Sequence, residues 1–479
     1  MFYNQGGQTG FQAETVNTNG NTNFNFGGSE LLESLESKRK KLLRTLYKLS
    51  KTEYENQKNQ NPVRVPGTCE WFTNHQIFQD WKSSPSSKML WVSADPGSGK
   101  SVLARYLIDS VLSTPGSTIC YFFFKEDLEE QKKATTALSS ILFQLFTANR
   151  SLICDKILDR YEIVEESFSS SFHELWRAFL IAASNADKIV CVLDALDECN
   201  SSDKSQLITK LKELYGKPTD LNLKFLVTSR PTRDIVHALR PVREVLHEAT
   251  GQQPLEVPES LLIHLNGDGD EEKEKIAREI NTFIDARVHE ISTKLQLGDN
   301  ECNLLSERLK NTQKLHPNNS GEITQNRTYL WVHLVLDLIE KDPNKNIGIN
   351  KDKIDKITSQ LPKTIDEAYE KILSRSCKHE EAKRLLQIVV AASRSLNLEE
   401  MYVAFTLKES HRSYDSLDTK FNSKEMERFG NDVRDRCGLF VRIVDSKIYL
   451  IHQTAKEFLI QREEEEKEKK KRNRRRRDK

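Results

Sequence analysis

The chain has 479 residues, of which 37% are hydrophobic and 30% are charged, and its formal net charge is +1. This length suggests two to four domains at about 150 residues each. No apolar stretch reaches the ~18 residues that a membrane span needs, and the N-terminus lacks the basic and apolar parts of a signal peptide, so we predict a cytoplasmic protein. The eight cysteines include no Cys-x-x-Cys pair, which favours reduced thiols over disulfides or a zinc site.

The first 28 residues differ from the rest of the chain because glycine, asparagine, glutamine and threonine dominate, with phenylalanines between them. One interpretation is a disordered segment, since too little apolar surface is present to form a core. The other is an amyloid-forming motif, since amide and aromatic side chains alternate over residues 19–28 and could stack in register as a cross-β structure. The sequence leaves both interpretations open.

Residues 29–65 are predicted to form a helical linker, with leucines at helical spacing and Ser29 as the N-cap. Pro66-Gly67 breaks this pattern and marks the start of the folded nucleotide-binding domain. A group of aromatic residues follows at helical spacing, which favours a hydrophobic core over stacking on a nucleotide base: Trp71, Phe72, Phe78 and Trp81.

A phosphate-binding P-loop is predicted over residues 90–108, where an apolar run enters a glycine-containing turn and continues as a helix. Two glycines let the backbone N–H groups face a common centre, and the start of the helix adds unpaired N–H groups and a positive dipole end. Lys100 is expected to bind the β- and γ-phosphates, and the Ser101 hydroxyl is expected to bind Mg²⁺. Ala94 replaces the first glycine of the usual pattern, so an ordinary glycine loop is the alternative. The predicted nucleotide-binding residues are Gly97, Ser98, Gly99, Lys100, Ser101 and Val102.

Three further buried strands are predicted over residues 118–124, 189–198 and 224–231, with helices between them. Strands that alternate with helices predict a parallel sheet with its site at the carboxyl edge. We expect the strand over 189–198 to emerge beside the P-loop.

Charged residues stand where two of these strands end. Asp194 has the chemistry to hold Mg²⁺ through water, and Asp197 or Glu198 could orient or deprotonate an attacking water. Arg230 could sense the γ-phosphate as a charge-assisted donor. A solvated helix start is the alternative for the acidic residues, and their position after a buried strand argues against it.

Other short blocks follow these motifs in a consistent order, at residues 66–71, 121–125, 193–198, 225–231, 329–332, 361–365 and 451–459. Together with the P-loop they resemble the fungal-type NACHT proteins of the STAND class of signal-transduction NTPases. The resemblance covers residues 66–460, and it is specific because unrelated blocks occur in the order of the family.

The resemblance implies an α/β P-loop NTPase domain with a parallel sheet, followed by a helical domain and a winged-helix domain, between disordered termini. It also implies that Asp194 is the Walker B acid, that Arg230 is the sensor arginine, and that His452 contacts the β-phosphate of bound ADP in a closed state. Without the resemblance, His452 would be read as a core or capping histidine. Related proteins place a proline against the base, and none stands near residues 327–329, so the choice between adenine and guanine stays open.

The chain is accordingly divided into six parts: 1–28, the possible amyloid segment; 29–65, the linker; 66–266, the nucleotide-binding domain; 267–375, the helical domain; 376–460, the winged-helix domain; and 461–479, a charged tail. Helices, a hairpin turning at Asp445-Ser446 and a final helix are the order of a winged helix. No basic recognition face accompanies it, so nucleic acid is not an expected partner. The tail is either a solvated helix extension, or a segment for nuclear localisation or for contact with nucleic acid.

Family members commonly continue into sensor repeats, and no repeat period is visible in this sequence. The chain would then be a fragment, a truncated gene product, or a receptor whose sensing is done by another chain.

These features predict a nucleotide-dependent signalling switch that binds and slowly hydrolyses ATP or GTP with Mg²⁺. The diphosphate would lock the closed state, and exchange for the triphosphate would allow self-oligomerisation. Oligomers would gather many N-terminal segments and trigger an innate-immunity or cell-death type response through a downstream effector with a matching amyloid motif. The alternatives are a constitutive NTPase enzyme and a passive amyloid-templating adaptor with a structural nucleotide.

Overall fold

The computed structural model describes residues 27–50, 54–216, 220–239, 262–267, 269–311, 327–340, 351–374, 379–407, 422–444 and 446–477. The predicted amyloid or disordered character of residues 1–28 therefore lies almost entirely outside the described residues, and so does Asp445 of the predicted hairpin turn. Within the described part, no helix is long and apolar enough to cross a membrane.

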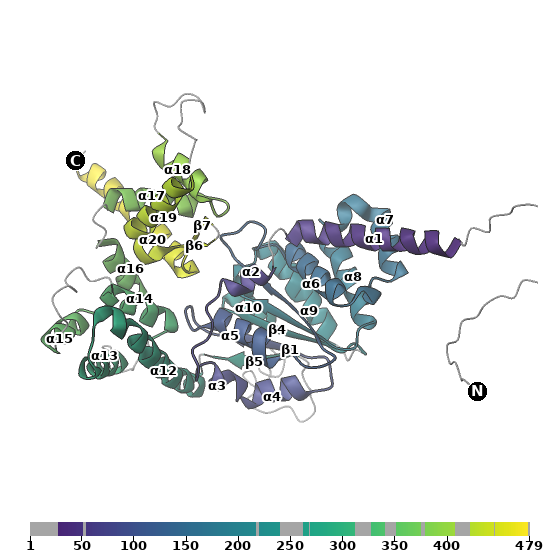
Figure 1. Cartoon of the computed structure of the whole chain (residues 1–479), viewed down its shortest axis with the longest axis horizontal. Helices are drawn as coiled ribbons and strands as arrows, with labels where there is room; N and C mark the ends of the chain where they lie inside the picture. Colours follow the sequence, from purple (N-terminus) through teal and green to yellow (C-terminus); the bar gives the residue numbers. More distant parts are fainter. Residues whose placement is uncertain are drawn as a thin grey trace, which may run out of the picture.

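The nucleotide-binding half is built on a five-stranded sheet in which all neighbouring strands are parallel (Figure 1). The strand order is β2-β3-β4-β1-β5. The strands are β1 (Met89–Ser93), β2 (Thr118–Phe123), β3 (Ile189–Asp194), β4 (Leu223–Ser229) and β5 (Leu262–Asn266). The predicted parallel α/β fold is thus confirmed, and four of the strands coincide with the predicted ones.

The order of the strands in the sheet was not predicted. β4 lies between β1 and β3 and pairs with both, and the end of β3 reaches the P-loop through the hydrogen bond from Ser101 to Asp194. Sequence order alone does not determine the spatial order of parallel strands, because each crossover can pass over a neighbour. The edge strand β5 was also not predicted, since its five residues carry no periodic signal.

Helices cover both faces of the sheet because alternate strand residues point to opposite sides. Met89 and Trp91 of β1 belong to one buried cluster, while Leu90 and Val92 belong to another. The first cluster is covered by α6 (Ala134–Ala148), α7 (Asp155–Phe168), α8 (Phe172–Ser184), α9 (Ser201–Tyr215) and α10 (Arg233–Leu239). The second is covered by α3 (Glu70–Thr73), α4 (Gln76–Ser83) and α5 (Lys100–Tyr106), which continues as a π-helical turn over Leu107–Val111.

The predicted N-terminal linker is mainly one long helix, α1 (Gly27–Ser50), followed by α2 (Tyr54–Asn59). Helix α1 begins at Gly27, so Ser29 lies inside the helix and is not its N-cap. Leu42 and Leu46 are fully buried in the same cluster as α6, and α1 lies along α6 in Figure 1. The linker residues therefore contribute to the core of the nucleotide-binding half.

The aromatic group near residue 71 belongs to the hydrophobic core, as the sequence favoured. Phe72, Phe78 and Trp81 are buried beneath the sheet, while Trp71 is half-buried at the boundary with the next helical unit.

A first helical unit follows β5 and packs around α12 (Asp270–Leu295), with α13 (Asp299–Asn311), α14 (Tyr329–Glu340) and α15 (Lys351–Ser359). The strongly apolar α14 is shared: Leu334 lies in the core of the C-terminal unit and the adjacent Val335 in the core of the first helical unit. A helix that is apolar around its whole circumference is expected to be buried on several sides.

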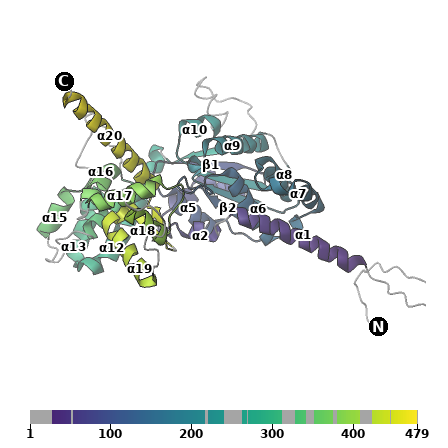
Figure 2. The same cartoon turned by 90° about the horizontal axis from the view of Figure 1, so that it is seen from above.

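The C-terminal unit contains α16 (Ile365–Ser374), α17 (His379–Ala391), α18 (Leu398–Thr406), α19 (Ser423–Cys437), the antiparallel strands β6 (Val441–Val444) and β7 (Lys447–Leu450), and α20 (Gln453–Arg477). The predicted order of helices, hairpin and final helix is observed, and the winged-helix interpretation stays a prediction. In Figure 2, α1 and α20 extend from opposite ends of the molecule.

Candidate functional site

The P-loop lies between β1 and α5, as its sequence predicts. Gly97 and Gly99 have φ angles of 74° and 90°, a left-handed region that strongly favours glycine. Gly99 is the N-cap of α5, so the free N–H groups of the first helical turn, including those of Ser101 and Val102, face the loop. The Ser98 hydroxyl oxygen is buried and forms no hydrogen bond within the described part of the chain. A loop that offers N–H groups and a spare hydroxyl fits a phosphate chain.

A hydroxyl and a carboxylate, both oxygen ligands of the kind that Mg²⁺ binds, meet beside this loop. Ser101 Oγ donates to Asp194 Oδ2 at 2.6 Å, and Thr228 Oγ1 donates to Asp194 Oδ1 at 2.6 Å. Thr228 also accepts a hydrogen bond from the N–H of Ala195, which keeps the end of β3 in place. Burial raises the pKa of Asp194, while hydrogen bonds from Ser101 and Thr228 oppose the rise. These oxygen donors fit Mg²⁺, which binds one or two carboxylates together with phosphates and water.

The two predicted catalytic acids have different surroundings. Asp197 is tied to Arg230, accepting its backbone N–H at 3.0 Å and pairing with its Nε at 3.2 Å. Glu198 instead accepts the N–H of Glu126 at 3.2 Å and lies near the ammonium of Lys125. Burial raises the pKa of Glu198 to about 7, with Lys125 opposing the rise. Asp197 thus positions Arg230, and Glu198 is the better candidate to accept a proton near neutral pH.

His452 is brought to the nucleotide site from the far end of the chain. Its Nδ1 accepts the N–H of Thr454 at 3.2 Å, so this nitrogen carries no proton. The pKa of His452 is lowered to about 3, mainly by burial and then by the positive charges of Arg230, Lys125, Lys100 and Arg442, in that order. A neutral ring with an unprotonated Nδ1 carries its proton on Nε2, which is a hydrogen-bond donor. The Nε2–H group could donate a hydrogen bond to a phosphate oxygen, whose negative charge the surrounding cations would also attract.

The first helical unit covers the outer side of the P-loop. Leu330 N donates to Gly97 O at 3.3 Å, and a Cβ added at Gly97 would lie 2.7 Å from Leu330 Cβ. The ring of Tyr329 lies against Gly99, and its hydroxyl donates to Glu279 Oε2 at 3.3 Å. The same carboxylate accepts the backbone N–H of Cys69 at 2.6 Å. The loop, α14 and the start of α3 are therefore connected through direct contacts.

The structure brings together Lys100, Ser101, Asp194, Asp197, Glu198, Arg230 and His452 around one edge of the sheet. Sequence reasoning missed the roles of Lys125, Thr228 and Glu279. Lys125 stands two residues after the end of β2, at the same carboxyl edge, so its position was a usable signal. Glu279 had no such signal, because its partner lies 210 residues away.

Comparisons with known proteins match the part of the chain that carries these residues. A protein-family model described as nephrocystin 3, N-terminal, matches residues 67–230, which contain the P-loop, β3 and Arg230. The vegetative incompatibility protein HET-E-1 of Podospora anserina is 24% identical over 400 residues, or 81% of this chain. The match covers 26% of that protein, so the chain spans about a quarter of the length of this relative.

Solved structures with a loosely similar arrangement include the Walker-type ATPase of Pyrococcus abyssi and the ORC2 protein of Aeropyrum pernix. The first is 11% identical with a TM-score of 0.32, covering 82% of this chain and 96% of the other. The second is 13% identical with a TM-score of 0.34, covering 84% and 95%. At TM-scores this low, neither similarity carries an argument about the site of this chain.

Proposed function

We propose that the chain is a nucleotide-operated signalling switch of the fungal NACHT type of P-loop NTPase, which the family-model match over residues 67–230 and the 24% identical incompatibility protein support. In the closed state a diphosphate lies between the P-loop and the C-terminal unit, with His452 donating to it. Exchange for a triphosphate releases the C-terminal unit and allows self-association. The observation that supports this proposal is that His452 lies close enough to Lys100 and Arg230 for their charges to lower its pKa, although both are more than 220 residues away in sequence.

Slow hydrolysis with Mg²⁺ would reset the switch. Ser101 and Asp194 would hold the metal, which supplies charge neutralisation of the phosphates. Glu198 would accept the proton of the attacking water, and Arg230, positioned by Asp197, would donate to the terminal phosphate.

The first test is to purify the full chain, identify any bound nucleotide by mass, and measure particle size with and without excess triphosphate. We expect a bound diphosphate in a monomer that grows into a discrete oligomer on exchange. An empty monomer that rapidly turns over triphosphate would instead show the alternative, a constitutive NTPase.

Lys100→Ala is the matched variant for this test. Lys100 Nζ contacts the carbonyl oxygens of Ala94 and Asp95 at 2.7 and 2.9 Å and stands at the phosphate site. Because it supplies the positive charge nearest the phosphates, we expect its loss to abolish nucleotide binding in calorimetry. Micromolar binding retained by Lys100→Ala would contradict the assigned site.

The signalling output remains part of the proposal. We propose that residues 1–28, gathered in an oligomer, nucleate cross-β assembly in an effector with a similar motif and so trigger a cell-death or immune-type response. The name of the curated relative, a vegetative incompatibility protein, is compatible with such a response. A chain lacking residues 1–26 should oligomerise on exchange and fail to seed fibres. If residues 1–28 form fibres at the same rate with and without the core, the passive-adaptor alternative is favoured.

The six-part division of the chain is likewise a proposal. Separate buried clusters in the first helical unit and the C-terminal unit support it, but α16 packs in the C-terminal cluster, so the boundary at residue 375 would lie before α16 instead. A cytoplasmic location, with the basic tail as a route to the nucleus, is proposed with it and can be tested by imaging the full chain and a chain that ends at residue 467.

A further inference from the structure

Arg230 is held by two carboxylates from distant parts of the chain. Its Nε pairs with Asp197 at 3.2 Å, and its Nη1 pairs with Glu457 of α20 at 2.8 Å. Asp197 is 8% exposed and belongs to the sheet edge, whereas Glu457 is 49% exposed and comes from the C-terminal unit. The first pair is thus a fixed part of the site, and the second can be broken without moving the sheet.

Two more contacts join the first turns of α20 to the nucleotide-binding half. Gln453 donates to Glu126, and Lys456 pairs with Asp127 at 2.9 Å. Both partners belong to the segment after β2, which also carries Lys125. We call these three contacts, made by Gln453, Lys456 and Glu457, the α20 latch.

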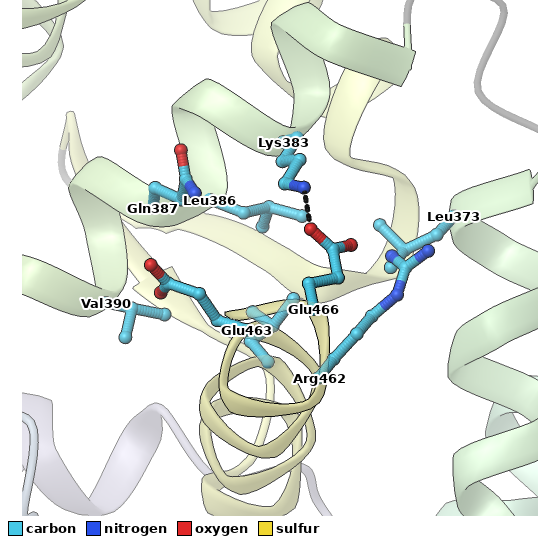
Figure 3. A pocket seen from close by; sticks show the side chains of 9 residues that line it. Leu373, Lys383, Leu386, Gln387, Val390, Arg462, Glu463 and Glu466 are labelled. Atoms are coloured by element: carbon cyan, nitrogen blue, oxygen red, sulfur yellow. Dashed lines mark hydrogen bonds and ion pairs between the residues drawn. The ribbon is translucent and has the colours of Figure 1, made fainter. Parts of the chain in front are cut away.

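The next turns of α20 are anchored to the C-terminal unit instead. Figure 3 shows a small pocket between α17 and α20, where Lys383 pairs with Glu466 and where Leu386 and Val390 form the apolar wall. Arg462 also pairs with Glu370 of α16 at 3.2 Å. Because one helix carries both the latch and this anchorage, a change at Glu457 is transmitted directly to the C-terminal unit.

We propose that Glu457 occupies the place at Arg230 for which the terminal phosphate of a nucleoside triphosphate competes, so that Glu457 determines the preference of the site for diphosphate over triphosphate. This inference rests on the proposed function and specifies how its two nucleotide states are distinguished. A diphosphate ends short of Arg230 and leaves the Glu457 pair intact.

The chemistry favours this exchange. A terminal phosphate carries more negative charge than a carboxylate and offers three acceptor oxygens, so it is the stronger partner for a guanidinium. Half-exposed ion pairs are weak because water screens them, so the Glu457 pair can be displaced. A ligand shifts a conformational equilibrium only if its affinities for the two states differ. In this proposal the triphosphate binds more tightly to the state in which Arg230 is not paired with Glu457.

The test compares the affinity of the full chain for a diphosphate and for a non-hydrolysable triphosphate analogue, both with Mg²⁺, by calorimetry. The base is the one identified by mass in the first experiment. Glu457→Gln removes the competing charge and keeps the size of the side chain. We expect the ratio of triphosphate to diphosphate affinity to rise about fivefold, because only the triphosphate gains from a vacated Arg230.

Two control variants make the result specific. Glu465→Gln makes the same charge change on an exposed part of α20 that faces Lys469, and it should leave the ratio unchanged. Lys456→Gln breaks another latch contact without touching Arg230, and it should change the ratio less than Glu457→Gln does. Equal changes in Lys456→Gln and Glu457→Gln would show general loosening of the latch and would overturn the competition.

The outcome also separates this inference from the proposed function. If the wild-type chain binds both nucleotides and Glu457→Gln keeps the wild-type ratio of affinities, the proposed competition at Arg230 is wrong. The proposed nucleotide-operated switch would not be contradicted by that result. If the wild-type chain binds neither nucleotide, the proposed function fails and the competition fails with it.

Discussion

Ala94 stands where the usual phosphate-binding loop has its first glycine, and its backbone explains why an alanine fits. Among the P-loop residues, positive φ angles occur at Gly97 and Gly99, and Ala94 is not one of them. Its carbonyl oxygen accepts a hydrogen bond from Lys100 Nζ at 2.7 Å, and its N–H donates to Ser229 O at 3.3 Å. Both contacts are made by the backbone, so a side chain at this position does not interfere with them.

His452 shows how a residue can be functional through its neutral form. Its ordinary pKa of ~6.5 falls to about 3 in the folded chain, first through burial and then through the nearby cations. Between these values the unfolded chain binds a proton that the folded chain does not bind. His452 therefore lowers stability as pH falls from about 6.5, by at most about 1.4 kcal/mol per pH unit.

We predict that this pH dependence can be isolated in His452→Gln. Glu198, whose pKa is raised to about 7, has the opposite effect, because its folded form holds a proton that the unfolded form releases above pH ~4.3. That effect is present in both proteins and cancels when they are compared. The melting temperature of the wild type relative to His452→Gln should fall between pH 7 and pH 5 in scanning calorimetry. Parallel curves would show that His452 titrates normally.

At the scale of elements, the contact between α14 and the P-loop joins the first helical unit to the nucleotide site. Leu330 and Tyr329, in the first turn of α14, pack directly on the two P-loop glycines. A glycine at these positions therefore serves two purposes, since it permits the positive φ angle and also leaves room for the helix.

A pair of substitutions separates these two purposes. Gly97 and Gly116 have nearly equal φ angles of 74° and 78°, but an added Cβ would clash with Leu330 only at Gly97, whereas nothing lies within 4 Å at Gly116. Gly116→Ala should lower the free energy of unfolding by ~1–2 kcal/mol through backbone strain alone. Gly97→Ala should lower it by a further ~1–3 kcal/mol, because the added methyl group overpacks the contact with Leu330. Thermal melting without nucleotide measures both, and equal losses would mean that α14 does not press on the loop.

At the scale of the whole molecule, α14 links the two C-terminal clusters and the latch links the last helix to the first half. Leu334 and Val335 are adjacent and fully buried, yet they lie in different cores. Movement of the C-terminal unit must therefore either carry α14 along or bend the chain at its ends.

Leu334→Ala and Val335→Ala test this sharing. Each substitution creates a cavity. We expect the free energy of unfolding to fall by ~2–5 kcal/mol for the leucine variant and by somewhat less for the valine variant. Because α14 belongs to both cores, both variants should lower one common melting transition of the two helical units. Glu340→Gln, which weakens only the surface pair with Lys294, is the control and should change stability by less than ~1 kcal/mol. Separate transitions in the two variants would show that the units unfold independently.

From the sequence it was possible to predict the P-loop, four parallel strands, the acids at the end of β3, Arg230, and the order of the C-terminal helices and hairpin. These features are local. Apolar runs, glycines and charged strand ends can be recognised in the sequence because the residues that form them are neighbours in the chain. Three features became visible only in the folded chain: β4 separates β1 from β3, α1 completes the core of the nucleotide-binding half, and Glu457 pairs with Arg230. Such contacts join residues that are far apart in the chain. They depend on how whole helices and strands pack together, and the spacing of residues in the sequence does not predict that packing.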